Sequence, residues 1–96
     1  MSEQKTQSKI LEWLMCNGFY ARKIIRANKS GTPDILGCTP CGKFFAIEVK
    51  YGHNTADELQ KYNLQLINQC KGIGFVAYDL ETVIARLGQY VIRNDV

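Results

Sequence analysis

The chain has 96 residues, enough for one small domain, and we predict a single domain over residues 1–96. Hydrophobic residues make up 46%, which argues against disorder, and no apolar run approaches the roughly 20 residues of a membrane span. A net charge of +3 permits nucleic-acid binding without requiring it. The polar N-terminus, MSEQKTQSK, is not a signal peptide, so we expect a cytoplasmic location and no membrane partner.

The first half of the chain predicts one helix followed by three strands. These elements are a helix over residues 3–15, a strand over 19–27, a polar loop over 28–32, and strands over 34–37 and 43–50. Ser2 is the expected N-cap of the helix, and Asn17-Gly18 its expected end. The turn Cys38–Gly42, which contains Pro40, should join the last two strands as a hairpin.

The second half predicts a helix, a strand and a final helix. Thr55 and Glu58 have the spacing of a capping box, so we expect a helix from there to about Cys70. The side chains expected near one face of this helix are Leu59, Tyr62, Leu66 and Ile67. A buried strand over 73–77, a helix capped by Asp79 and ending near Leu87, and a short tail strand within 89–96 complete the pattern. The order α-β-β-β-α-β-α implies an α/β fold, a mixed sheet with helices on both sides.

Three charged residues lie in segments otherwise suited to burial. Glu48 and Lys50 are two positions apart on one predicted strand and therefore point to the same face, away from Phe45, Ile47 and Val49. Asp34 begins the partner strand of the hairpin, so pairing should bring it close to both. Two neighbouring carboxylates repel each other, and a divalent cation such as Mg²⁺ resolves that repulsion. This arrangement suits metal-assisted phosphodiester hydrolysis, in which Lys50 could orient water or stabilise an oxyanion.

Other interpretations of these residues are open from spacing alone. A Glu-Val-Lys sequence near a strand end is often a solvated edge, and an Asp after Pro is often a turn residue. Cys38 and Cys41 have the CxxC spacing of zinc and redox sites, but no second CxxC or histidine pair accompanies them. We therefore expect all four cysteines, which include Cys16 and Cys70, to be structural thiols.

The combined motifs resemble the PD-(D/E)xK nuclease superfamily and, more narrowly, the virus-type replication-repair nuclease (VRR-NUC) domain. Gly31-Thr32-Pro33-Asp34 matches the Gly-x-Pro-Asp motif of that family, and Glu48-Val49-Lys50 matches its Glu-x-Lys motif at the end of an apolar strand. A helix that carries Gln60-Lys61 and a strand that opens with Gly72 follow in the family's order. Glu3 and Gln7, four positions apart, match the opening of its first helix. The resemblance implies a restriction-endonuclease-like core over nearly the whole chain.

The resemblance also implies roles for individual residues. Asp34 and Glu48 would hold Mg²⁺, or Mn²⁺ in its place, together with the backbone carbonyl of Val49. Lys50 would be the catalytic lysine, and Gln60 would position water or phosphate. Glu3 would contact the metal through water, and Glu12 is the alternative acid. The basic residues expected to contact nucleic acid are Arg22, Lys23, Arg26, Lys29 and Lys61.

The activity expected from the resemblance is that of a structure-selective endonuclease similar to Holliday-junction resolvases. Its substrate would be branched DNA such as a four-way junction, in a bacterial or phage-infected cell. It would act as a homodimer, with apolar helix faces that include Trp13, Leu14 and Tyr62 as the interface. The alternatives are a flap or duplex nuclease of the same fold, or a nucleic-acid-binding module without turnover.

Overall fold

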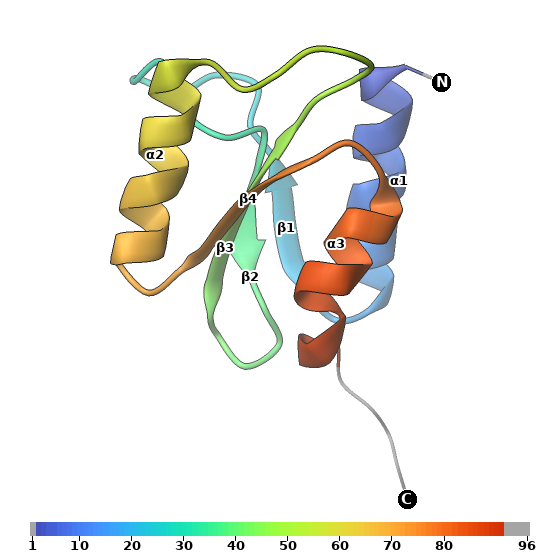
Figure 1. Ribbon diagram of the computed structural model, residues 1–96. Helices are drawn as coiled ribbons and strands as arrows, with labels where there is room; N and C mark the ends of the chain where they lie inside the picture. Colours follow the sequence, from blue (N-terminus) through green and yellow to red (C-terminus); the bar gives the residue numbers. More distant parts are fainter. Residues whose placement is uncertain (1, 92–96) are drawn as a thin grey trace, which may run out of the picture.

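The computed structural model describes residues 2–91 and places a four-stranded sheet between helices (Figure 1). In chain order the elements are α1 (Glu3–Cys16), β1 (Tyr20–Lys23), β2 (Ile35–Cys38), β3 (Phe44–Val49), α2 (Glu58–Gln69), β4 (Ile73–Ala77), α3 (Leu80–Leu87) and the 3₁₀ helix η1 (Gly88–Tyr90). The predicted order of helices and strands is therefore confirmed. None of the helices within residues 2–91 has the length and apolarity that a membrane span needs.

The sheet is mixed, as expected from the sequence. Its strands lie in the order β1-β2-β3-β4, with antiparallel pairing of β1 with β2 and of β2 with β3, and parallel pairing of β3 with β4. A parallel pair requires a crossover, which α2 provides. Helices α1 and α3 contact each other and one face of the sheet, whereas α2 covers the other face (Figure 1).

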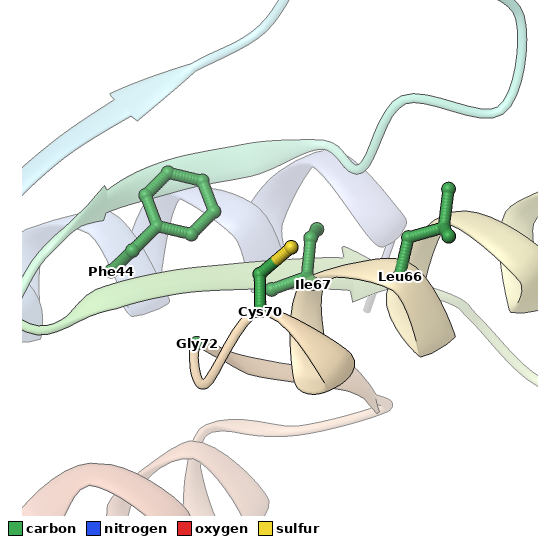
Figure 2. Close-up of a pocket in the computed structure, with 5 residues that line it drawn as sticks. All are labelled: Phe44, Leu66, Ile67, Cys70 and Gly72. Carbon is green, nitrogen blue, oxygen red and sulfur yellow. The ribbon is translucent and has the colours of Figure 1, made fainter.

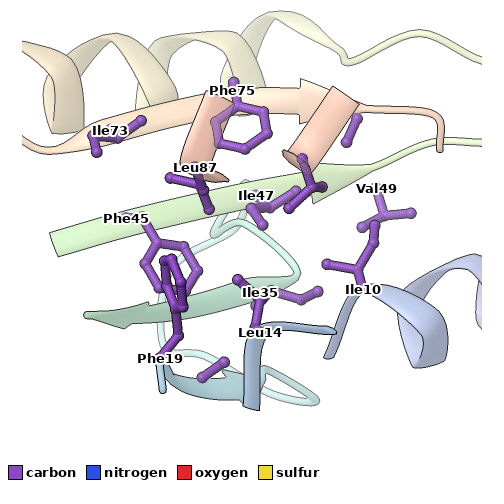
Figure 3. Packing of buried hydrophobic residues seen from close by; sticks show 13 residues of the cluster. Ile10, Leu14, Phe19, Ile35, Phe45, Ile47, Val49, Ile73, Phe75 and Leu87 are labelled. Atoms are coloured by element: carbon purple, nitrogen blue, oxygen red, sulfur yellow. The ribbon is translucent and has the colours of Figure 1, made fainter. Parts of the chain in front are cut away.

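The main core lies between the sheet and the pair α1–α3. Along β3, Phe45, Ile47 and Val49 point into this core, where Ile10 and Leu14 of α1 join them (Figure 3). Since side chains alternate along a strand, the intervening residues of β3 point toward α2. The expected division of this strand into an apolar face and a face that bears Glu48 is thus correct.

Helix α2 lies close to the sheet because Gly74 of β4 has no side chain. A Cβ atom at Gly74 would lie 3.1 Å from the backbone carbonyl oxygen of Leu64. Asn68 fixes the same approach, because its side-chain amide donates to the carbonyl of Gly74 and accepts from the N–H of Gly74, both at 2.9 Å. The helix is therefore held at a defined position over the Glu48 face of β3.

The structure corrects three sequence-based expectations and leaves a fourth largely untested. Strand β1 ends at Lys23, so residues 24–27 belong to a loop. Helix α2 is capped by Asp57, whose partner in the capping box is Gln60, instead of by Thr55 with Glu58. Its expected apolar face is mostly outward, since Leu59, Tyr62 and Leu66 are exposed and Leu64 is the buried residue. Residues 88–90 form η1, with Val91 as its C-cap, and residues 92–96 of the expected tail strand lie outside the described residues.

Candidate active site

Strand register places Asp34 opposite Glu48. Ile35 pairs with Ile47 in the antiparallel ladder of β2 and β3, so the preceding residue of β2 comes to lie across from the following residue of β3. The Asp34 carboxylate accepts a hydrogen bond from the backbone N–H of Val49 at 2.8 Å. This bond fixes the Asp34 side chain over the end of β3, beside Glu48 and Lys50.

Glu48 is a buried acid with an unusual set of neighbours. The residue is only 2% exposed, and its Oε2 accepts from Nε2 of Gln60 at 3.1 Å and lies 3.4 Å from Nζ of Lys50. Its other oxygen, Oε1, is buried and has no hydrogen-bond partner. Burial, followed by the nearby Asp34 carboxylate, raises the pKa of Glu48 to about 7, although the Lys50 ammonium acts in the opposite direction.

Gln60 contacts Glu48 from the first turn of α2. Its backbone N–H donates to Oδ1 of Asp57 at 2.8 Å, while its side-chain Oε1 accepts from the Asp57 N–H at 2.9 Å. The capping box therefore fixes the amide of Gln60, and Nε2 is the atom left to donate to Glu48. Asp57 and Gln60 have the spacing of a capping box in the sequence, but Thr55 and Glu58 have the same spacing, which predicts the cap at Thr55 instead.

The donor atoms at this position fit a divalent cation that prefers oxygen ligands. A buried carboxylate oxygen without a partner is costly, and a cation that binds the unpartnered Oε1 of Glu48 would remove that cost. The N–H and C=O of a strand residue point to the same side, so the Val49 carbonyl faces the strand from which Asp34 comes. No group of three or more His, Cys, Asp or Glu residues that could hold a metal occurs within residues 2–91. Two carboxylates with a carbonyl suit Mg²⁺, which keeps several waters.

The first helix carries the other two acids that the sequence suggested for the site, Glu3 and Glu12. Glu3 is half-buried in the first turn of α1, and it belongs to no metal-binding group with Asp34 and Glu48 in the part of the chain that is described. Gln7, one turn further, is 5% exposed, and its Oε1 is buried without a hydrogen-bond partner. The sequence pattern included Gln7 but gave it no role, because burial of its amide depends on packing. Glu12, the alternative acid, is exposed.

The expected nucleic-acid contacts are all solvent-exposed. Arg22 lies over the Tyr20 ring, with its guanidinium carbon 4.2 Å from the ring centre, and donates to the Ala21 carbonyl. Lys61 lies 3.6 Å from Glu58, and both side chains are more than half exposed, so this ion pair is weak. Lys23 is the last residue of β1, and Arg26 and Lys29 lie in the loop after it.

A separate apolar pocket lies at the other end of α2. Figure 2 shows its lining residues, which are Phe44, Leu66, Ile67, Cys70 and Gly72. Cys70 is about 15 Å along the helix from Gln60, given a rise of 1.5 Å per residue. The pocket has no carboxylate or amine, so we exclude it as the hydrolytic site. The four cysteines are free thiols, of which Cys38 is half-buried and the other three are exposed.

Comparison with solved structures agrees with this fold. No protein-family model matches the chain, and no curated protein matches it. One solved structure, described as a "VRR_NUC domain", superimposes with a TM-score of 0.77 and 25% sequence identity, and the match covers 92% of this chain and 96% of that chain. A second, described as a "VRR_NUC domain protein", has a TM-score of 0.76 and 20% identity, covering 94% of this chain and 88% of that chain.

The mixed sheet, its flanking helices and the Asp34–Glu48 pair define the class of this protein as an α/β domain of the PD-(D/E)xK nuclease fold. Within that class the structural likeness confirms the resemblance that the motifs indicated, since the chain is similar over nearly its whole length to two solved VRR-NUC domains. The domain is therefore of a nuclease type.

Proposed function

We propose that this chain is a divalent-metal-dependent endonuclease that hydrolyses phosphodiester bonds in DNA. The observation that carries the proposal is the buried carboxylate of Glu48, which lies opposite Asp34 and has one oxygen without a partner. Burial of Glu48 beside the half-buried carboxylate of Asp34 costs stability, and a structural role alone does not require it. A cation at this position explains both the pair and the unpartnered oxygen.

In this proposal each residue near the cation has a distinct role. Asp34, Glu48 and the Val49 carbonyl would hold Mg²⁺ or Mn²⁺, which supplies Lewis acidity toward water and phosphoryl oxygen. Lys50, whose side chain is 16% exposed, holds its ammonium 3.4 Å from Glu48 and can orient the attacking water or stabilise charge on the phosphate. Gln60 donates to Oε2 of Glu48 and so fixes the orientation of that carboxylate. Glu3 is proposed as an outer contact through water.

The proposed substrate is branched DNA, with a four-way junction as the first choice. The support is the resemblance to resolvase-like nucleases, together with the exposed basic residues Lys23, Arg26 and Lys29 in β1 and in the loop that leads to Asp34. A flap or duplex nuclease and a binding module without turnover are the alternatives.

A homodimer is proposed with the substrate, because symmetric cutting of a junction suits a two-fold dimer. Leu14 is fully buried and cannot form its interface, which corrects one expected residue. Trp13 is partly buried against the core and contacts Phe19, whereas Tyr62 is 54% exposed and remains available.

The test is cleavage of three labelled substrates, a four-way junction, a flap and a linear duplex, with Mg²⁺ or Mn²⁺. The comparison is between wild type, Lys50→Ala, and the matched control Lys43→Ala. Lys43 just precedes the opposite end of β3, about 23 Å from Lys50 at the rise of a strand.

Symmetric nicks in the junction alone, lost in Lys50→Ala and kept in Lys43→Ala, would support the proposal in full. Cutting of flaps or duplex would keep the active site and reject the junction preference. Metal-dependent cutting that survives in Lys50→Ala would refute the assigned mechanism, and junction binding without cutting would favour the binding module.

A further inference from the structure

Ile25 is the most exposed of the large hydrophobic side chains within residues 2–91. It is 91% exposed, whereas the others on the surface range from 39% to 58%. Single exposed apolar residues are common, so exposure alone decides nothing. Its position in the fold and the charge around it indicate what this side chain contacts.

The loop that carries Ile25 begins at the candidate active site. The backbone N–H of Ile24 donates to the carbonyl of Asp34 at 2.7 Å, which closes the base of a loop over residues 25–33. Opposite Cα atoms in a strand pair are about 5 Å apart, and consecutive ones about 3.8 Å, so the Cα of Ile25 lies within about 9 Å of that of Asp34. That span corresponds to about three nucleotides of one DNA strand.

The charge of this segment suits a polyanion. Lys23, Arg26 and Lys29 are exposed, and the sequence from Ile24 to Pro33 contains no acidic residue. A loop that contacted an apolar protein groove would not need three cations around one isoleucine. Phosphates on either side of an inserted side chain would match this arrangement.

The loop is held in place at its second half. The Thr32 hydroxyl donates to the Lys29 carbonyl at 2.8 Å, and Gly31, with φ +82°, packs directly against Leu59 and Asn63 of α2. Pro33, next to Asp34, is buried. These contacts hold the second half of the loop against α2, and the hydrogen bond from Ile24 to Asp34 holds its first half next to Ile25.

We propose that Ile25 is a wedge that inserts between bases of bound DNA within about three nucleotides of the phosphate that reacts at the candidate active site. Apolar side chains used in this way unstack a base step and bend the strand, and branched DNA has bases that are already less well stacked. The wedge would select deformable or branched DNA for the nuclease. The inference rests on the proposed function for its substrate, but the test below does not require cleavage.

The test uses DNA that carries aminopurine, a fluorescent adenine analogue that brightens when it is unstacked, at successive positions around a junction branch point. Ca²⁺ replaces Mg²⁺ so that binding is followed without turnover. Fluorescence at saturating protein is compared for wild type, Ile25→Ala, Ile25→Met and Ile84→Ala. Ile84 is a matched control, since it is also exposed, at 41%, but lies on α3.

We expect wild type, Ile25→Met and Ile84→Ala to brighten the analogue at one or two adjacent positions. Ile25→Ala should lose most of that rise and bind about fivefold or more weakly, the lower end of what the stacking of one base contributes. An equal rise with Ile25→Ala, no rise with wild type at any position, or no DNA binding would overturn the inference. A rise that depends on Ile25, with no cutting in Mg²⁺, would uphold the wedge and reject the nuclease.

Discussion

Replacement of Glu48 by glutamine should stabilise the metal-free protein at alkaline pH. Glutamine keeps the shape of a protonated carboxyl group and can donate to Asp34, but it brings no charge into the buried site. Glu48 is 2% exposed and lies beside a second carboxylate, so its ionised form is the costly one. The substitution removes that cost permanently.

The magnitude follows from the pKa of Glu48, which rises from an ordinary 4.5 to about 7 in the folded protein. Between these values the folded state binds more protons than the unfolded state, so the free energy of unfolding falls as the pH rises. Each pKa unit corresponds to about 1.4 kcal/mol, so the full loss above pH 7 is about 3 kcal/mol. For a domain of this size, that difference shifts Tm by about 12–24 °C.

The assay is urea unfolding of wild type and Glu48→Gln in EDTA from pH 4 to pH 8.5. Because both proteins share every other titrating group, their difference isolates Glu48. We expect similar stabilities near pH 4 and a growing advantage for Glu48→Gln up to about pH 8. Added Mg²⁺ should stabilise wild type by about 2.7 kcal/mol at a hundredfold excess over its Kd and leave Glu48→Gln nearly unchanged.

A constant difference between the two proteins over this pH range would show that Glu48 is not buried as an acid of raised pKa. Equal stabilisation of both proteins by Mg²⁺ would show that the cation binds elsewhere. Either result would remove the physical argument for the candidate metal site.

Two further substitutions test how the site is supported. Gly37→Ala should destabilise the domain by about 3 kcal/mol or more, because a Cβ there would overlap the Tyr20 carbonyl and the Phe45 ring. Urea unfolding measures this loss of stability, and a loss below about 1 kcal/mol would contradict the close packing at Gly37. Asp57→Ala should cost about 1 kcal/mol as a lost N-cap and should also lower cleavage, since it releases Gln60 from the capping box. Asp79→Ala removes the matching cap of α3 and serves as the control that costs stability without lowering cleavage of folded protein.

Sequence by itself determined the elements whose signals are local. Ser2 and Asp79 are N-caps at the predicted positions, and α1, β4 and α3 begin and end within a residue or so of their expected bounds. The turn between β2 and β3 fixed the hairpin, and period-2 alternation then placed Glu48 on the face opposite Phe45. The approach of Asp34 to Glu48 and Lys50 follows from this pairing, so it was also predictable.

Only the tertiary structure decided which face of α2 is buried and which atoms surround Glu48. Helix α2 has apolar residues on more than one side, and its orientation depends on how closely Leu64 can approach Gly74, two residues joined only by folding. The raised pKa of Glu48 and its unpartnered Oε1 arise from burial of this side chain in the folded protein and from the nearby Asp34 carboxylate, which no local pattern encodes. The same holds for Ile25: its sequence neighbours suggested a longer strand, but β2 offers no further pairing beyond Asp34, so the chain leaves the sheet and exposes the side chain beside the site.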